Sequence, residues 1–207
     1  MEVKDLALYL EGIQAEVVAA KDWLIDLDAA IGDGDLGLTM TRGFTAVAEE
    51  CRASDETDLG KLLVKLGMTF NRVAPSTMGT LMAAAFMRAG RALKGETELK
   101  VEQIPALLEA AIEGIKDRGK SQRGDKTIID VLEPATEKLK EELEAGQDLA
   151  EAWAAAAVVA EEAFEATAEM ESKVGRAGWF GAQSKGKLDP GAGLGLVVWR
   201  AIGKCLE

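Results

Sequence analysis

Apolar residues recur at intervals of three and four along almost the whole of this 207-residue chain. This spacing is typical of amphipathic α-helices. Alternating β-branched residues, which would indicate strands, are scarce, and no convincing strand is predicted. The pattern predicts helices over residues 3–28, 38–53, 59–72, 77–93, 101–118, 127–144, 149–172 and 191–205.

The breaks between these helices are short, and this limits how the helices can be arranged. A short loop cannot carry the chain back to the far end of a long helix, so consecutive helices run antiparallel. We therefore expect an all-α fold, a closed antiparallel barrel or bundle of about eight helices with its site at one end. Nearly half of the residues are apolar, which is enough for one core but not two, so residues 1–207 are predicted to form one domain.

Composition excludes several kinds of site. The chain contains no histidine, and this rules out a phosphohistidine, a histidine-ligated metal or a histidine base. Cys51 and Cys205 lack the CxxC spacing of a zinc site and do not suggest a disulfide framework. With 24 basic and 36 acidic residues, a net charge of −12 argues against nucleic acid as a partner.

The ends and the hydropathy of the chain predict its location. The N-terminus lacks the basic start and apolar run of a signal peptide. No stretch approaches the length of a membrane span, so no membrane partner is expected. A cytoplasmic location follows.

The strongest motif is the segment LDAAIGDGDLG at residues 27–37. Asp28 lies on a last helical turn, whereas Asp33 and Asp35 alternate in a glycine-rich loop. Residues i and i+2 of an extended chain point the same way, and glycines permit a bend back toward Asp28. Three crowded carboxylates favour a cation between them, and Mg²⁺ prefers such oxygen ligands. Alternatively, Gly32 only ends a helix, and one of the aspartates caps the next.

Three further loops combine small, polar and charged residues. The segment RGKSQRGDKT at 118–127 places several cations before a helix N-terminus, where phosphate or an acidic loop can bind, without the Walker spacing. It also fits a connector in which Asp125 or Thr127 caps the helix. In APSTMGT at 74–80, Ser76 or Thr77 serves equally well as a cap. The loop before Asp189 carries Arg176, which can neutralise phosphate.

The segments 27–44 (LDAAIGDGDLGLTMTRGF), 118–135 (RGKSQRGDKTIIDVLEPA), 175–177 (GRA) and 188–193 (LDPGAG) resemble the L subunit of dihydroxyacetone kinase, the DhaL-like family. The resemblance covers essentially the full chain. It implies an eight-helix barrel that binds ADP or ATP with Mg²⁺, as two ions, at one end. By position, Asp28, Asp33 and Asp35 match the metal ligands. The nucleotide-contacting positions correspond to Leu36, Gly37, Leu38, Thr39, Ser76, Thr77, Met78, Gly119, Ile128, Arg176, Asp189, Pro190 and Gly191.

The resemblance also implies an activity. It is that of a glycerone kinase-type phosphotransferase, dependent on ATP or phosphoenolpyruvate, which phosphorylates dihydroxyacetone or a similar ketose held by a separate substrate-binding subunit. A phosphotransferase-system protein is a second implied partner. Two alternatives remain open. One is a fatty-acid kinase nucleotide domain, although the longer chain and PDGDTG-like loop of that family are absent. The other is a non-catalytic, nucleotide-loaded binding or regulatory module.

Three places depart from the family pattern. Leu36 stands where the family often has histidine or cysteine, Lys187 replaces a common histidine, and residues 74–80 follow the glycine-serine loop only loosely. Loss of a polar group at Leu36 favours the binding module. Asp125 and Lys126 belong to the family motif and are expected to support the site without touching the ligand.

Overall fold

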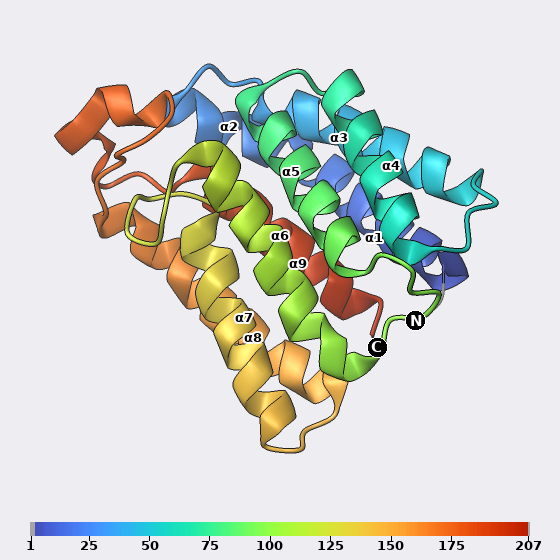
Figure 1. Ribbon diagram of the computed structural model, residues 1–207. Helices are drawn as coiled ribbons and strands as arrows, with labels where there is room; N and C mark the ends of the chain where they lie inside the picture. The colour runs from blue at the N-terminus through green and yellow to red at the C-terminus, as the bar shows by residue number, and fades with distance from the viewer. Residues whose placement is uncertain (1–2, 207) are drawn as a thin grey trace.

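The computed structural model describes residues 3–206, and this part of the chain is helical, with no β-strand (Figure 1). The all-α prediction is confirmed. The helices are α1 (Val3–Ala19), α2 (Lys21–Ile31), α3 (Leu36–Arg52), α4 (Leu59–Val73), α5 (Thr77–Ala92), α6 (Ile104–Gly119), α7 (Ile129–Glu144), α8 (Leu149–Ala166) and α9 (Pro190–Lys204). Short 3₁₀ turns are η1 (Val101–Gln103), η2 (Thr167–Glu169) and η3 (Ala177–Ser184).

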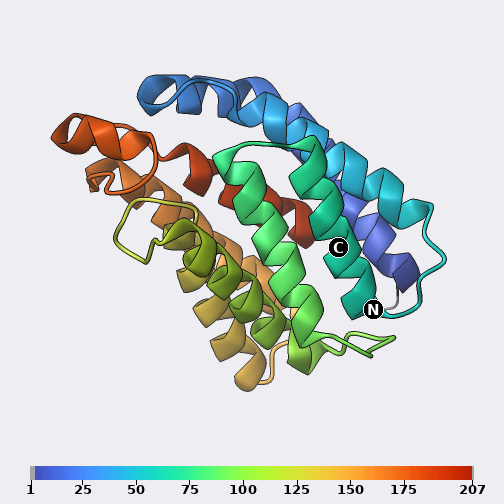
Figure 2. The ribbon, with the colours of Figure 1, turned by 45° about the horizontal axis from the view of Figure 1, so that its top comes forward.

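The helices form a closed ring. From α3 onward each α-helix packs against the next, and α9 returns to contact α1 and α2. In Figure 2 the red helix α9 runs between the blue-to-green helices and the yellow-to-orange helices. The linkers α2–α3, α4–α5, α6–α7 and α8–α9 lie at the same end, toward the upper left of Figure 1. None of the described helices is both long and apolar enough to cross a bilayer.

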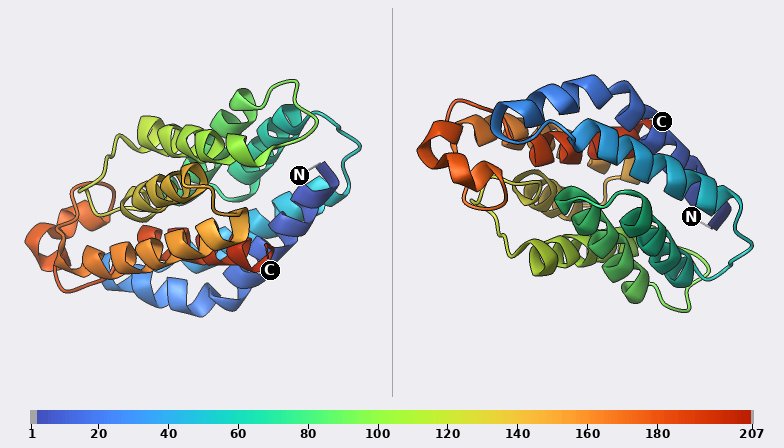
Figure 3. Two further views of the ribbon diagram at one scale, coloured as in Figure 1. Left: turned by 90° about the horizontal axis from the view of Figure 1, so that it is seen from below. Right: turned by 90° about the horizontal axis from the view of Figure 1, so that it is seen from above.

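The first predicted helix, residues 3–28, is two helices. α1 and α2 meet at an angle at Ala20 (Figure 3), where helical hydrogen bonds of 2.9 Å still run from Ala20 N–H to the Glu16 carbonyl and from Leu24 N–H to the Ala20 carbonyl. The chain therefore changes direction here while these helical hydrogen bonds are kept. Helix α3 packs closely against the start of α2 at this bend. No side chain would fit at Gly37, since it would collide with the Lys21 carbonyl oxygen. The apolar spacing continues through the bend, so the sequence pattern does not reveal it.

The end of the helix predicted over 149–172 also differs. Helix α8 stops at Ala166 and continues only as the 3₁₀ turn η2. The Thr167 hydroxyl donates to the Phe164 carbonyl at 2.6 Å, and this side-chain bond competes with the regular helical ladder. The chain then leaves the barrel and forms a long connection to α9.

The core consists of adjoining apolar clusters. One joins α1, α3, α4, α5 and α9 and includes Phe44 and Phe70, whose rings pack edge to face at 5.2 Å. Another joins α7, α8 and α9 around Trp153 and Trp199, stacked at 4.4 Å. Burial of apolar side chains in these clusters stabilises the barrel, and the aromatic pairs add favourable ring contacts.

Two glycines set the distance between α4 and α5. A methyl group on Gly60 would lie 2.5 Å from the carbonyl oxygen of Gly90, and one on Gly90 would lie 2.6 Å from that of Gly60. The two backbones therefore touch. Closer approach increases van der Waals contact around the crossing.

We expect Gly90→Ala to lower the free energy of unfolding by about 1–3 kcal/mol, because the methyl group forces α4 and α5 apart. This loss should exceed the usual helical gain from replacing glycine by alanine. Urea unfolding measures the difference. Gly203→Ala is the matched control, since its methyl group would lie 3.1 Å from a Trp153 side-chain atom rather than against backbone. An effect of Gly90→Ala no larger than that of Gly203→Ala would contradict the role of this contact.

Candidate functional site

The three aspartates of the strongest motif converge. One carboxylate oxygen from each of Asp28, Asp33 and Asp35 lies within 4.8 Å of the others. Asp28 comes from the last turn of α2, and the other two come from the linker to α3. Two glycines make this possible: Gly34 has a φ of +74°, and any side chain at Gly32 would collide with the Asp28 carboxylate. The two glycines therefore allow the three carboxylates to lie close together.

Asp28 also begins the next helix. Its Oδ2 accepts hydrogen bonds from the backbone N–H groups of Asp35 at 2.9 Å and Leu36 at 3.2 Å, at the N-terminus of α3. Asp35 occupies the N-cap position, but its side chain makes no cap bond. The alternative of a capping aspartate is thus realised by Asp28. Its Oδ1 lies toward Gly32 and is not used by these bonds.

The electrostatics of the cluster favour a cation. Burial raises the pKa of Asp28, the charge of Asp33 raises it further, and the hydrogen bond from Leu36 opposes this shift. Both effects that raise the pKa do so because they make the ionised form of Asp28 less favourable in free energy. A bound cation would offset this penalty, and oxygen ligands of this kind suit Mg²⁺.

A cavity of about 260 Å³ adjoins the aspartates. Its volume is just below the range of roughly 300–1,000 Å³ that is usual for small-molecule sites. All four linkers at this end contribute to its wall. The wall contains the three aspartates and most of the positions predicted to contact nucleotide, namely Leu36, Ser76, Thr77, Met78, Gly119, Ile128, Arg176, Asp189, Pro190 and Gly191.

Three predicted positions lie off this wall. Gly37 packs against the backbone of α2, Thr39 is buried within α3, and Leu38 is exposed. They follow Leu36 on the helix, and successive helical residues point in different directions. Their proposed contact with nucleotide therefore requires backbone groups of the first turn of α3.

Other residues of the cavity wall were not predicted from the sequence. They include Leu81 and Ser121, next to Gly119, together with Ile31, Gly32, Pro75, Lys126, Thr127, Val174, Gly175 and Ala177. Leu81 is one turn into α5, and its apolar side chain has the same pattern as a core residue. Only its distance from a functional loop could have indicated it.

Arg176 reaches the aspartate cluster from the other end of the sequence. Its guanidinium pairs with the carboxylate of Asp33. Lys187, where the family has histidine, donates to the Ala30 carbonyl at 2.7 Å, near the C-terminus of α2. A cation there also interacts favourably with the helix dipole. The connection between α8 and α9 is thus tied to the linker that carries Asp33 and Asp35.

Residues 30–204 match the family model of the DAK2 domain. The chain belongs to the DAK2 domain family. It is 36% identical over 171 residues to the PEP-dependent dihydroxyacetone kinase, ADP-binding subunit DhaL, of Escherichia coli, covering 83% of this chain and 81% of that protein. The corresponding subunit of kinase 1 of Listeria innocua is 36% identical over 200 residues, covering 96% of this chain and 95% of that protein.

A solved structure also resembles this DAK2 domain. It is the dihydroxyacetone kinase from C. freundii in complex with AMP-PNP and Mg²⁺, with a TM-score of 0.74 and 26% identity. The match covers 96% of this chain and 33% of that chain. The resemblance to the L subunit stated from the sequence is therefore confirmed, together with the all-helical fold.

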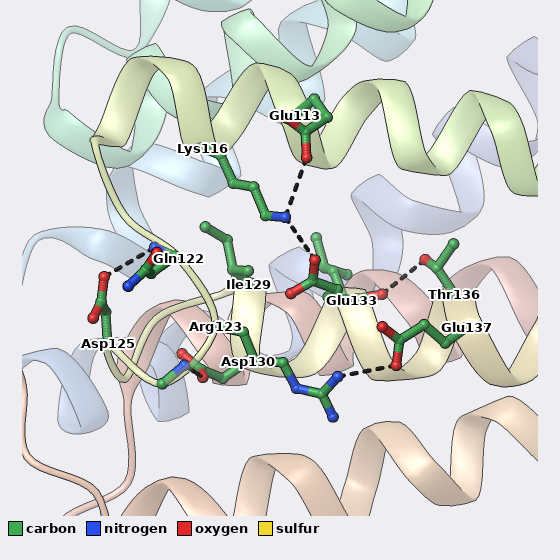
Figure 4. Close-up of polar contacts among 12 residues, drawn as sticks. Glu113, Lys116, Gln122, Arg123, Asp125, Ile129, Asp130, Glu133, Thr136 and Glu137 are labelled. Carbon is green, nitrogen blue, oxygen red and sulfur yellow. Dashed lines mark hydrogen bonds and ion pairs between the residues drawn. The ribbon is translucent and has the colours of Figure 1, made fainter.

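Arg123 of the 118–127 loop and Lys116 on α6 of this DAK2 domain pair with acidic residues of the helices and not with the three aspartates. Figure 4 shows Arg123 turned along α7 to Glu137, at 3.0 Å, and Lys116 between Glu113 and Glu133. Asp130 accepts from Thr127 N–H at 2.7 Å and from Gly124 N–H at 2.6 Å. The cap expected at Thr127 is also present, since its hydroxyl oxygen accepts from Ile129 N–H at 3.2 Å, whereas Asp125 accepts from Gln122 N–H at 2.9 Å within the loop.

Asp189 is the buried acid of the cavity wall. Its Oδ2 accepts from Ala192 N–H at 2.7 Å and caps α9, as the Asp-Pro sequence predicts. Burial raises its pKa to about 7, whereas the Ala192 hydrogen bond and the charge of Lys126 act in the opposite direction. The N-cap of α9 is therefore an ionisable side chain whose negative charge is disfavoured by burial.

Replacing Asp189 by asparagine should flatten the pH dependence of stability. The pKa in the folded state, about 7, lies above the ordinary 3.8, so the folded state holds the proton more tightly and stability falls as the pH rises between these values. The slope is at most about 1.4 kcal/mol per pH unit. Asparagine keeps the cap without this titration. Urea unfolding of both proteins across this range measures the effect, and parallel pH profiles would refute it.

Proposed function

We propose that this DAK2 domain is the nucleotide-carrying subunit of a dihydroxyacetone-type kinase. It binds ADP or ATP with Mg²⁺ and acts with a separate subunit that holds dihydroxyacetone or a similar small ketose. The observation that carries the proposal is the convergence of three carboxylates beside a cavity reached by Arg176. The similarity to ADP-binding subunits over most of the chain supports it. Residues 1–207 would act as one domain.

The donor set fits magnesium. Asp28, Asp33 and Asp35 supply hard oxygen atoms close enough to share ions, and we propose two. When bound, the ions would neutralise phosphate charge and align the phosphoryl group for transfer. The hydrogen bonds to Oδ2 of Asp28 hold that carboxylate in place before any ligand arrives. Such preorganisation lowers the cost of binding.

The remaining wall suits a nucleotide. Arg176 offers a planar fork of N–H donors for phosphate oxygens. Helix α5 begins at the cavity, and its first N–H groups, at Thr77 and Met78, have no partner within the helix. Met78, Leu81 and Ile128 provide apolar surface for a base. The wall thus has separate charged and apolar parts.

The chemistry would depend on alignment and charge neutralisation. The γ-phosphoryl group of ATP would pass to a ketose hydroxyl, while the chain itself supplies no histidine for proton transfer. The Escherichia coli and Listeria innocua relatives reported above are named PEP-dependent. We propose that ADP stays bound here and is rephosphorylated by a phosphotransferase-system protein, so that the nucleotide acts as a coenzyme.

One observation favours a second candidate, a nucleotide-loaded binding module without catalysis. Leu36 is 5% exposed and lies on the cavity wall, where the family often has a polar side chain. A phosphate-binding contact would then be missing. Turnover with a purified substrate-binding subunit separates the candidates, because a module binds nucleotide but transfers no phosphate to the ketose.

Magnesium-dependent nucleotide affinity tests the proposal directly. Asp35→Asn keeps the shape of the side chain but removes the negative charge of a proposed metal ligand, and Asp35 makes no side-chain cap bond that would be lost. We expect its dissociation constant for ADP with MgCl₂ to rise at least about tenfold. Calorimetric titration with and without MgCl₂ measures it. Asp26→Asn, an exposed change on α2, is the matched control. Affinity that depends neither on MgCl₂ nor on Asp35 would overturn the proposal.

A further inference from the structure

Lys126 is a buried cation that the proposed chemistry does not use. It is 1% exposed and lies on the cavity wall. Its Nζ donates to three main-chain carbonyls: Ser184 at 2.6 Å, Lys187 at 2.6 Å and Met170 at 3.2 Å. An ammonium has three protons, and these contacts use all three. None is left for a phosphate group.

All three carbonyls belong to one segment, residues 168–187, which we name the arginine loop because it carries Arg176. Its two ends are joined by a hydrogen bond of 2.8 Å from Gly186 N–H to the Ala168 carbonyl. Within it, Ser172 N–H donates to the Ser184 hydroxyl oxygen at 2.8 Å. The Lys126 ammonium therefore lies at the closed base of the loop, and Arg176 lies on the part that projects to the aspartates.

Neighbours of Lys126 reinforce this arrangement. Lys173 N–H donates to the Asp125 carbonyl at 3.2 Å, and the Lys173 ammonium pairs with the Asp125 carboxylate at 3.3 Å. Lys126 itself has a φ of +61°, a conformation that side chains rarely adopt. Burial lowers the pKa of the Lys126 amine, whereas the charge of Asp189 raises it. A conformation and a burial that are both unfavourable need strong compensating contacts, and the three carbonyls provide them.

We infer that Lys126 is a positioning residue: its ammonium closes the base of the arginine loop and thereby holds Arg176 at the three-aspartate site. The functional part of this inference rests on the proposed nucleotide binding. The loop-closing part does not. A neutral side chain at this position would leave the carbonyls of Met170, Ser184 and Lys187 without their charged donor, and the loop would open at its base.

The test uses Lys126→Gly, because glycine accepts a positive φ without strain. Lys120→Gly is the matched control, since Lys120 also has a positive φ, of +53°, but is exposed on the same connection. Lys126→Met is a second variant that fills the space without a donor. Hydrogen exchange of peptides from the arginine loop is measured in nucleotide-free protein. Calorimetry with ADP and MgCl₂ follows, and circular dichroism checks the helices.

We expect exchange in the arginine loop to be at least about tenfold faster in both Lys126 variants, and their dissociation constants for ADP to rise by at least about tenfold. Lys120→Gly should match the parent protein. Butylammonium chloride should slow the loop exchange of Lys126→Gly and not that of Lys126→Met, whose side chain occupies the same space. Should Lys126→Gly fail to fold, Lys126→Met carries the exchange and affinity measurements.

The outcomes separate the possible roles. Unchanged loop exchange with weaker ADP binding would make Lys126 a phosphate ligand and overturn the inference. Faster loop exchange with unchanged ADP affinity would also overturn it, because Arg176 would then not depend on the loop base. If the parent protein binds no ADP, the proposed function fails, while selective loop opening in the Lys126 variants still supports the closing role.

Discussion

The structure depends on the crowding of three negative charges at the end of α2. Asp28, Asp33 and Asp35 approach within 4.8 Å, and the local sequence makes this possible through Gly32 and Gly34. Repulsion among them is only partly offset by the N-terminus of α3 and by Arg176. This arrangement supports the proposal that the cluster binds divalent ions and, through them, phosphate. The other linkers at this end form the wall of the adjoining cavity, and Arg176 pairs with Asp33 of the cluster.

The direction of the helices explains why the site is at one end. In an antiparallel ring every second linker lies on the same side, so four linkers distant in sequence form one wall. The helices that begin there, α3, α5, α7 and α9, direct their N-termini toward the cavity side. The linkers at the opposite end, such as residues 53–58 and 145–148, are ordinary polar turns. The order of the helices along the chain therefore determines which loops meet at the site.

Local features were predictable from the sequence, and long-range ones were not. The convergence of the aspartates follows from glycine spacing, and the cap of α9 follows from Asp189 and Pro190. The helix ranges follow from apolar periodicity. The bend at Ala20 depends on the approach of α3, which leaves no local pattern. Whether a residue belongs to the wall depends on helix phase, and this explains why Leu36 lies on it while Leu38 does not.

The sequence suggested a supporting role for Lys126 but not the partners through which it acts. Its partners are main-chain carbonyls of another segment, and every residue type carries such a group. Spacing can suggest where a lysine lies, but it cannot show that 44 to 61 positions separate the ammonium from its acceptors. The partners of Asp130, by contrast, are local: its side chain accepts from backbone N–H groups of the preceding loop, three and six residues away.

The return of α9 to α1 and α2 has a consequence for biosynthesis. A chain emerging from the ribosome exposes its three aspartates early, whereas Arg176 and α9 are synthesised later. Until α9 is made the ring is open, with the apolar faces of α1 and α8 uncovered where α9 will pack. A chain stalled before α9 would therefore be a substrate for chaperones.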